Sequence, residues 1–158
     1  MHKTQDIKLK ATQKDSSRRQ SIIDRYGRTF DYLRLAVNEI CNLRCIYCMP
    51  EQGIIFKSKD KILQKREIFK LIKITTDLGV NKVRFTGGEP LLRKEIFEII
   101  NFTKKIKTVK SINLTTNGIL LSDMLNELKS SGLSGINISI DTLNPEKYKT
   151  ISRRDSLD

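Results

Sequence analysis

The sequence predicts an α/β fold in which about four β/α units build a curved parallel sheet. From Tyr32 onward, short runs of β-branched residues alternate with segments of helical periodicity, and glycine or a helix-capping residue separates each pair. The strands also alternate in polarity, since Arg34 lies between Leu33 and Leu35. A parallel sheet covered on both faces is normally apolar throughout. One polar face therefore indicates a sheet that curves around a polar interior, as in a partial, TIM-like β/α barrel.

Four strands are expected in this sheet. They cover about residues 32–37, 82–86, 111–115 and 135–140. In the second and fourth strands, Arg84 and Ser139 belong to the polar face, whereas Val83 and Ile138 belong to the apolar face. We expect the polar side chains to line the barrel interior, where enclosed ligands bind.

Helical periodicity follows each strand. The helices are expected at about residues 64–78, after residue 90, at 122–131 and from 144 onward. Gly79 and Gly132 suit helix C-caps, and Asn144 with Pro145 suits a helix start. The second helix carries a set of apolar residues for its inward face: Ile96, Phe97, Ile99 and Ile100.

The domain organisation is one core domain with a leading arm. Residues 1–21 are polar and show no periodicity, so we expect a flexible arm. Residues 22–158 are sufficient for one hydrophobic core. The sequence ends one or two turns into a crossover helix, which would leave the fourth strand as an exposed edge. We therefore expect a core domain truncated at its C-terminal end, or one half of a split enzyme.

The charge balance is strongly basic. Thirty Lys and Arg against 18 Asp and Glu give a formal charge of +12, which favours a polyanion such as a nucleoside triphosphate or RNA. Many lysines fall on outer helix faces, however, and no basic run is interleaved with aromatics, so nucleic acid is the less favoured partner. No apolar run is long enough for a bilayer or a secretory signal. We expect a cytoplasmic protein, with organelle targeting by the arm as the alternative.

The three cysteines lie within eight positions, at Cys41, Cys45 and Cys48, directly after the first strand. This is the edge at which barrel enzymes place their chemistry. Three thiolates can hold three irons of a [4Fe–4S] cube and leave the fourth iron open to a small molecule. Zinc with a fourth ligand, or cysteines in the core, are the alternatives, and the one histidine, His2, lies in the arm.

Two motifs resemble the radical S-adenosylmethionine superfamily. They are the CxxxCxΦC pattern of Cys41 to Cys48 and the GGEP sequence of Gly87 to Pro90. The resemblance implies that S-adenosylmethionine chelates the open iron and is cleaved by an electron from the cluster to a 5′-deoxyadenosyl radical. We also expect the adjacent glycines to allow close approach of the backbone to the methionine moiety.

Further segments resemble the GTP 3′,8-cyclase family of lyases in molybdenum cofactor biosynthesis. They are the stretches 24–28, 32–35, 48–51, 84–93, 115–118 and 137–143. The resemblance implies six β/α units, conversion of GTP to its 3′,8-cyclised form, an electron donor and a homodimer when complete. It also implies a second, C-terminal [4Fe–4S] cluster on three more cysteines, and this sequence has no cysteine after Cys48.

Matching positions of the cyclase family imply two sets of site residues. Those that contact S-adenosylmethionine are Tyr47, Gly88 and Ser139, and those that contact GTP are Arg34, Arg84 and Thr115. The strand alternation agrees for Arg34, Arg84 and Ser139, and a pair of guanidinium groups suits a triphosphate. A salt bridge from either arginine to Asp141 or Glu89 is the structural alternative.

Two other functions remain open at this point. A small radical enzyme that makes a glycyl radical on a partner protein would explain the length without truncation. A three-cysteine zinc module that binds RNA would explain the charge, but it leaves the GGEP motif and the β/α alternation unexplained.

Overall fold

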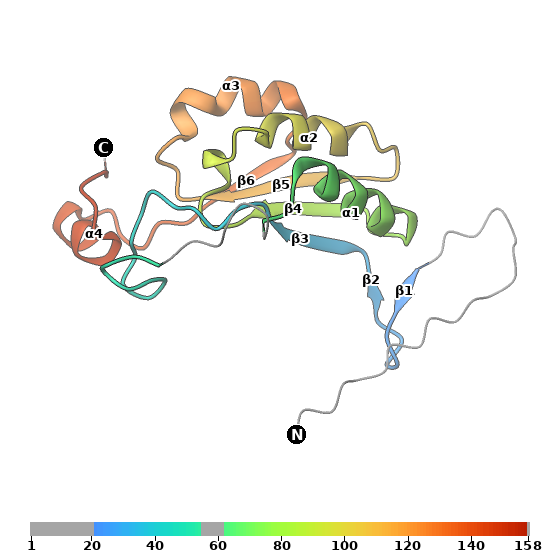
Figure 1. Ribbon diagram of the computed structural model, residues 1–158, viewed down its shortest axis with the longest axis horizontal. Helices are drawn as coiled ribbons and strands as arrows, with labels where there is room; N and C mark the ends of the chain where they lie inside the picture. Colours follow the sequence, from blue (N-terminus) through green and yellow to red (C-terminus); the bar gives the residue numbers. More distant parts are fainter. Residues whose placement is uncertain (1–20, 55–61, 158) are drawn as a thin grey trace, which may run out of the picture.

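The computed structural model describes residues 21–54 and 62–157, and its main body is a four-stranded parallel sheet covered by helices on one face (Figure 1). The sheet order is β3 (Tyr32–Ala36), β4 (Lys82–Thr86), β5 (Ser111–Thr116) and β6 (Gly135–Ile138). All three neighbouring pairs are parallel. The predicted α/β fold is confirmed, and the expected arm lies almost wholly outside the described residues.

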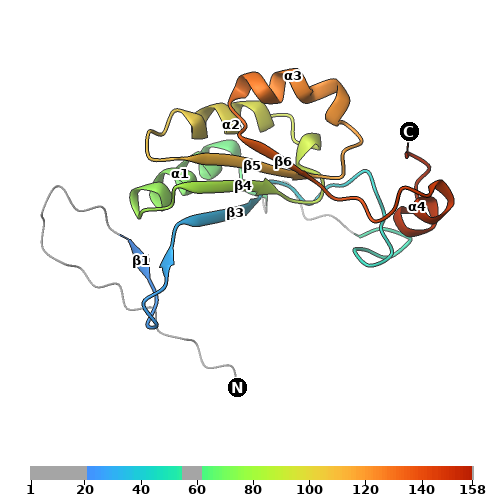
Figure 2. The same cartoon turned by 180° about the vertical axis from the view of Figure 1, so that it is seen from behind.

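Three helices lie side by side on the same face of the sheet, as Figures 1 and 2 show from opposite sides. They are α1 (Lys65–Asp77), α2 (Ile96–Lys104) and α3 (Leu121–Ser131). A fourth helix, α4 (Pro145–Ser152), lies beyond the carboxyl ends of the strands. No described helix covers the opposite face of the sheet (Figures 1 and 2). The polar strand residues alternate with the buried apolar ones and so belong to this face.

The core forms between the sheet and these helices because the apolar residues of each strand point toward them. Val83 and Phe85 of β4 are fully buried, together with Leu114 of β5. The buried helix residues that pack in the same cluster are Ile68, Ile72, Ile96, Ile99, Ile100 and Leu128. Each such side chain contributes about 1.5–3 kcal/mol on burial, so this layer fixes the positions of the strand ends.

The predicted helix boundaries are confirmed where the sequence has a helix-capping residue. Gln64 forms a capping box with Glu67 at the start of α1, and Gly132 ends α3 in the left-handed conformation. Asn144 accepts the N–H of Lys147 at 3.0 Å and caps α4. These ends are set by local chemistry alone.

Other boundaries differ from the predicted ones. After Pro90 the chain forms a short 3-10 turn, η2 (Pro90–Leu92), before α2 begins, and Phe97 is only half-buried at the edge of the core. β6 ends at Ile138 and not at residue 140, the predicted end. The last hydrogen bond to the neighbouring strand is the one that Ser139 donates to the Thr116 carbonyl at 2.8 Å, and the chain then leaves the sheet. Ile138 is 54% exposed, so the apolar face of this edge strand is only partly covered.

A β-hairpin that the periodicity did not predict precedes the sheet. β1 (Ile22–Ile23) pairs antiparallel with β2 (Thr29–Phe30). The Asp24 side chain accepts the backbone N–H groups of Tyr26 and Arg28, each at 2.9 Å, and Gly27 adopts a φ of 81° in the turn. These bonds to Arg28 and Tyr26 outweigh partial burial and lower the pKa of Asp24.

Candidate functional site

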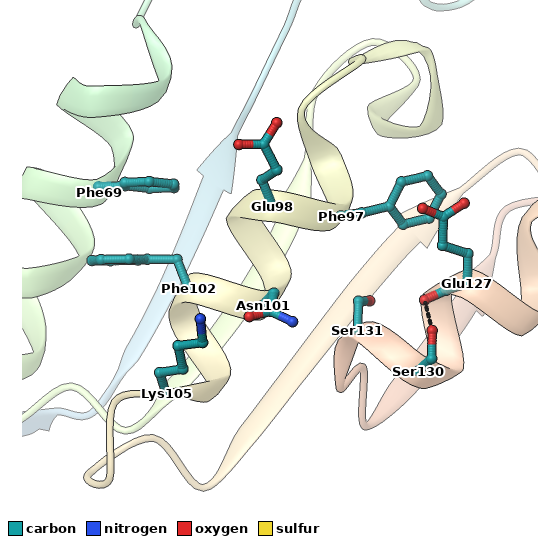
Figure 3. Close-up of a pocket in the computed structure, with 9 residues that line it drawn as sticks. All are labelled: Phe69, Phe97, Glu98, Asn101, Phe102, Lys105, Glu127, Ser130 and Ser131. Carbon is teal, nitrogen blue, oxygen red and sulfur yellow. Dashed lines mark hydrogen bonds between the residues drawn. The ribbon is translucent and has the colours of Figure 1, made fainter.

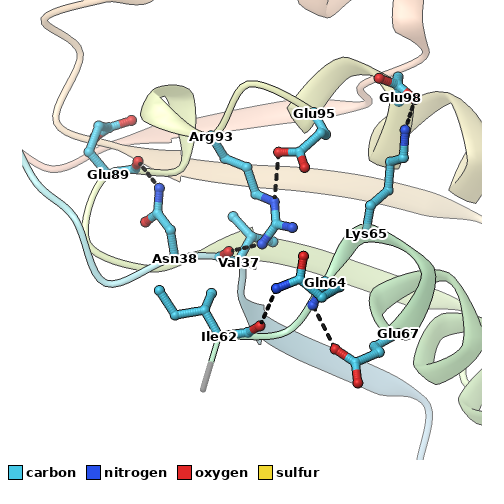
Figure 4. Close-up of polar contacts among 10 residues, drawn as sticks. All are labelled: Val37, Asn38, Ile62, Gln64, Lys65, Glu67, Glu89, Arg93, Glu95 and Glu98. Carbon is cyan, nitrogen blue, oxygen red and sulfur yellow. Dashed lines mark hydrogen bonds and ion pairs between the residues drawn. The ribbon is translucent and has the colours of Figure 1, made fainter. Parts of the chain in front are cut away.

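The loops that follow the strands meet at the carboxyl edge of the sheet. The loop after β4 runs along the segment after β3, since Gly88 donates to the Asn38 carbonyl at 3.0 Å and Glu89 donates to the Ile40 carbonyl at 2.7 Å. The Asn38 side chain in turn donates to the Glu89 carbonyl at 2.9 Å (Figure 4). The GGEP loop and the start of the cysteine loop therefore form one hydrogen-bonded unit.

The two glycines of the GGEP motif are required by this close contact. A Cβ on Gly87 would lie 2.5 Å from the Asn38 carbonyl oxygen, and one on Gly88 would lie 2.3 Å from that of Ile40. No side chain fits at such distances. The expected reason for the glycines was approach to a ligand, whereas the structure shows that the chain's own backbone fills the Cβ positions.

Glu89 is a buried structural link, only 1% exposed. Its carboxylate accepts hydrogen bonds from the Leu91 N–H at 3.0 Å, the Thr116 hydroxyl at 2.8 Å and the Asn117 N–H at 2.8 Å. A buried carboxylate is stable only when it is hydrogen-bonded in this way. Glu89 thus joins the ends of β4 and β5, a role that sequence reasoning missed.

Arg93 fixes the entry to the cysteine loop. Its guanidinium donates to the Val37 carbonyl and lies 3.4 Å from the Glu95 carboxylate (Figure 4). The backbone N–H of Val37 also donates to the carbonyl of Thr86, at the end of β4, at 2.8 Å. Because Val37 is held through both its N–H and its carbonyl, the chain enters the loop in a defined direction.

The cysteine loop places three free thiols at this edge. Cys41 and Cys45 are half-buried and Cys48 is exposed. Burial raises the pKa of the Cys45 thiol, opposed by a hydrogen bond with Tyr47, and the charges of Asp141, Cys41 and Cys48 raise it further.

The three thiols come from one short loop but do not form a finished metal site. Among residues 21–54 and 62–157, no three Cys, His, Asp or Glu side chains are gathered at metal-ligand spacing. Binding loops for metals usually take their final geometry with the metal. The donor set itself fits an iron–sulfur cluster, since thiolate is the usual ligand of its irons.

The end of α4 holds the far side of the cysteine loop. Arg44 donates to the Ser152 carbonyl and Ile46 to the Ile151 carbonyl, both at 2.9 Å. Arg153, in the left-handed conformation with φ 54°, donates to the Met49 carbonyl at 3.0 Å. This contact between segments about a hundred residues apart was not predicted.

The three residues predicted to contact S-adenosylmethionine lie in the loops after β3, β4 and β6. Tyr47 is 68% exposed, and its hydroxyl donates to Asp141, two residues after Ser139, at 2.8 Å. That hydrogen bond is the main cause that raises the pKa of Tyr47, with burial second. Gly88 and Ser139 are both exposed residues at the same edge.

The three residues predicted to contact GTP lie on the open face of the sheet. Arg34 and Arg84 are register partners on β3 and β4, so their side chains emerge from adjacent strands about 4.8 Å apart. Arg84 donates to the Thr115 hydroxyl at 3.1 Å, and its buried Nε has no hydrogen-bond partner among the described residues.

The alternative role predicted for Arg34 and Arg84, a salt bridge to Asp141 or Glu89, is wrong. Neither forms an ion pair with a described carboxylate. Asp141 is bonded to Tyr47, and Glu89 is bonded to Thr116 and to backbone groups. Two like charges side by side repel each other, so this face is suited to an anion.

A pocket lies on the helical side of the sheet, between α1, α2 and α3 (Figure 3). Phe69 and Phe102 form one wall, with their rings stacked 4.1 Å apart, and Glu98, Glu127 and Lys105 line its rim. None of the predicted site residues lines it. The candidate site is the loop edge and open face of the sheet.

Comparison with known families decides the class of the protein. The model of the Radical SAM superfamily matches residues 35–158. The chain belongs to the radical S-adenosylmethionine superfamily. Membership implies a [4Fe–4S] cluster and S-adenosylmethionine as cofactors, and it excludes the zinc module as the class of this chain.

The chain is also similar to curated proteins of one activity. It is 52% identical to GTP 3′,8-cyclases of Petrotoga mobilis and Clostridium botulinum over 84% of its length. It is 50% identical to molybdenum cofactor biosynthesis protein 1 of Dictyostelium discoideum over the same share. The chain spans 41% of the two bacterial relatives and 21% of the Dictyostelium protein.

Solved structures support the fold. The crystal structure of Streptococcus suis SuiB bound to S-adenosylmethionine matches 80% of this chain and 27% of that chain with a TM-score of 0.62 at 20% identity. In the described ranges, no helix is both long enough and apolar enough to cross a membrane.

Proposed function

We propose that this chain supplies the cluster-binding and S-adenosylmethionine-binding part of a GTP 3′,8-cyclase of molybdenum cofactor biosynthesis. The observation that carries the proposal is the 52% identity to named cyclases, in a chain whose two predicted GTP-contacting arginines are register partners on one open face. The relatives favour this activity over a glycyl-radical activase. Residues 22–158 are proposed as the core domain.

Cys41, Cys45 and Cys48 would hold the cluster. When bound, a [4Fe–4S] cluster supplies the electron that cleaves S-adenosylmethionine to a 5′-deoxyadenosyl radical. The role of the chain is to present three thiolates from a loop held on both sides: by Arg93 at its start and by Arg153 at its end. These two contacts would keep the loop, and a cluster bound to it, at the carboxyl edge of the sheet.

Gly88, Tyr47 and Ser139 would bind S-adenosylmethionine at that edge. The Gly88 N–H is used by the Asn38 carbonyl, so Gly88 would offer its carbonyl oxygen to an amino group, and Ser139 would offer a hydroxyl after the end of β6. Tyr47 lies over the edge with its hydroxyl bound to Asp141, so its ring orientation is fixed before a ligand arrives.

Arg34, Arg84 and Thr115 would bind GTP on the open face. Arginine forks pair with phosphate oxygens in two parallel hydrogen bonds, and the hydrogen bond from Arg84 to the Thr115 hydroxyl holds its guanidinium on this face. An anion between Arg34 and Arg84 would also offset the repulsion of their charges.

Three further elements of the cyclase activity belong to the proposal. The 158 residues hold no cysteine outside the first loop, so the second cluster implied by the cyclase resemblance would need cysteines from elsewhere. An electron donor and a homodimer are further elements of the proposal. A reducing cytoplasm suits three free thiols.

The test is production of 5′-deoxyadenosine. The chain is reconstituted anaerobically with iron and sulfide, reduced and given S-adenosylmethionine, and the product is measured by chromatography. We expect product from the parent chain and from Ser130→Ala, an exposed change on α3, and loss of product in Cys41→Ala. Absence of an iron–sulfur cluster in the parent chain, or zinc in its place, would overturn the proposal.

A further inference from the structure

Asn117 is fixed in the loop after β5 by two hydrogen bonds. Its backbone N–H donates to the buried Glu89 carboxylate at 2.8 Å, and its side-chain oxygen accepts the Ile119 N–H at 3.1 Å. Because the oxygen is engaged on that side, the amide nitrogen must face the cysteine loop.

Both hydrogens of that amide are directed at the cysteine loop. Nδ2 of Asn117 lies 2.7 Å from the Asn42 side-chain oxygen and 3.9 Å from the Cys41 sulfur. Cys41 also accepts the Leu43 N–H at 3.4 Å. The Cys41 sulfur is therefore in contact with two N–H donors, one from its own loop and one from the loop after β5.

We propose that Asn117 is a positioning residue that holds Cys41 and tunes the charge on its sulfur. The inference rests on the proposed role of Cys41 as a cluster ligand. Hydrogen bonds donated to a ligating sulfur stabilise the more negative, reduced cluster and raise its reduction potential. The chain of contacts from Glu89 through Asn117 to Cys41 couples the GGEP loop to the metal ligand.

Asn117 differs from a residue that only packs. Its amide oxygen accepts from Ile119, and its amide nitrogen donates to Asn42 and to the Cys41 sulfur. An apolar replacement of the same volume removes all three of these bonds, whereas an aspartate keeps the oxygen that accepts the Ile119 N–H and loses only the N–H groups that face Asn42 and the Cys41 sulfur.

Two variants and a control test this inference in the reconstituted 158-residue chain. Asn117→Leu removes the donors and the acceptor of the Ile119 N–H at similar volume. Asn117→Asp keeps that acceptor and places a negative oxygen toward Cys41. Asn101→Asp, on the exposed side of α2, adds the same charge away from the site. The measurements are iron and sulfide content, thermal unfolding of the apoprotein, and the midpoint potential from an EPR-monitored titration.

We expect full iron content in Asn117→Leu and a midpoint potential lower than that of the parent by about 59 mV. For one electron, this is a tenfold change in the ratio of reduced to oxidised cluster. The midpoint potential of Asn117→Asp should be lower still, or this variant should lose iron while its apoprotein unfolds at the same temperature as the parent. The Asn101→Asp control should match the parent.

Three results would overturn the inference. An unchanged potential in both variants with full iron would show that Asn117 does not act on Cys41. Unfolded apoprotein in both variants would show a folding role instead. A parent chain that assembles no cluster would remove the proposed function itself, an outcome that is distinct because the parent fails along with the variants.

Discussion

The hydroxyl of Tyr47 donates a 2.8 Å hydrogen bond to the carboxylate of Asp141, a residue 94 positions later in the chain. This bond connects the cysteine loop to the end of β6 across the carboxyl edge of the sheet. The cysteine loop is also bonded to the loop after β5, since Asn117 donates to Asn42. Contacts between distant segments therefore hold the loops together at this edge, and each contact can be tested by itself.

The first prediction concerns the ionisation of Tyr47. Its hydrogen bond to Asp141 stabilises the neutral phenol and raises the pKa above the ordinary value of 10.0. Asp141→Asn removes the negative charge, so the phenol should ionise at lower pH, closer to that ordinary value. Tyrosinate absorbance during a pH titration measures this change.

The chain has four tyrosines, so Tyr47→Phe serves to assign the transition. The difference between the parent and Asp141→Asn should vanish when both also carry Tyr47→Phe. Superimposable titrations of the parent and Asp141→Asn would mean that the bond does not persist in solution.

The second prediction concerns Gly88. Gly88→Ala would force a Cβ to within 2.3 Å of the Ile40 carbonyl oxygen, and the backbone shift should cost about 1–3 kcal/mol of unfolding free energy. Gly135→Ala is the matched control, because its Cβ would lie 2.8 Å from the side-chain oxygen of Asn113, and a side chain moves aside more easily than backbone. Urea unfolding should show the larger loss in Gly88→Ala, and equal losses would contradict the steric argument.

The fold and the candidate site were predictable to different degrees. The strands could be predicted because their alternation is a local pattern, and the ends at Gly132 and Asn144 because a cap is a local interaction. The hairpin before β3 was missed because each of its strands has only two residues. Such short strands carry no measurable period, although Asp24 and Gly27 are turn residues.

The site residues were predictable as types and not as contacts. Three cysteines in one loop indicate a cluster because of their chemistry, whatever surrounds them. The roles of Glu89 and Arg153 depend on partners from other elements, Asn117 and Met49 among them. Contacts of this kind follow from the tertiary fold, and no spacing within one segment encodes them.

The third prediction concerns Glu89. Glu89→Gln keeps the size of the side chain but turns one acceptor into a donor that opposes the N–H of Asn117 or the Leu91 N–H. Leaving a buried donor unsatisfied costs about 1–3 kcal/mol. Glu127→Gln, on the exposed surface of α3, should change stability little. Chemical unfolding of both variants compares them, and equal midpoints would show that Glu89 is not a structural link.

The fourth prediction concerns Arg153. Its left-handed backbone costs a non-glycine residue about 1–2 kcal/mol, which Arg153→Gly removes along with the guanidinium bond to Met49. We expect stability close to the parent but faster hydrogen exchange at the amides of Arg44 and Ile46, because the C-terminal end of α4 holds the loop less firmly. Arg153→Ala keeps the strain and loses the bond, so it should lower stability and speed exchange together. Unchanged exchange in both variants would show that the backbone bonds to Ile151 and Ser152 hold the loop without the guanidinium.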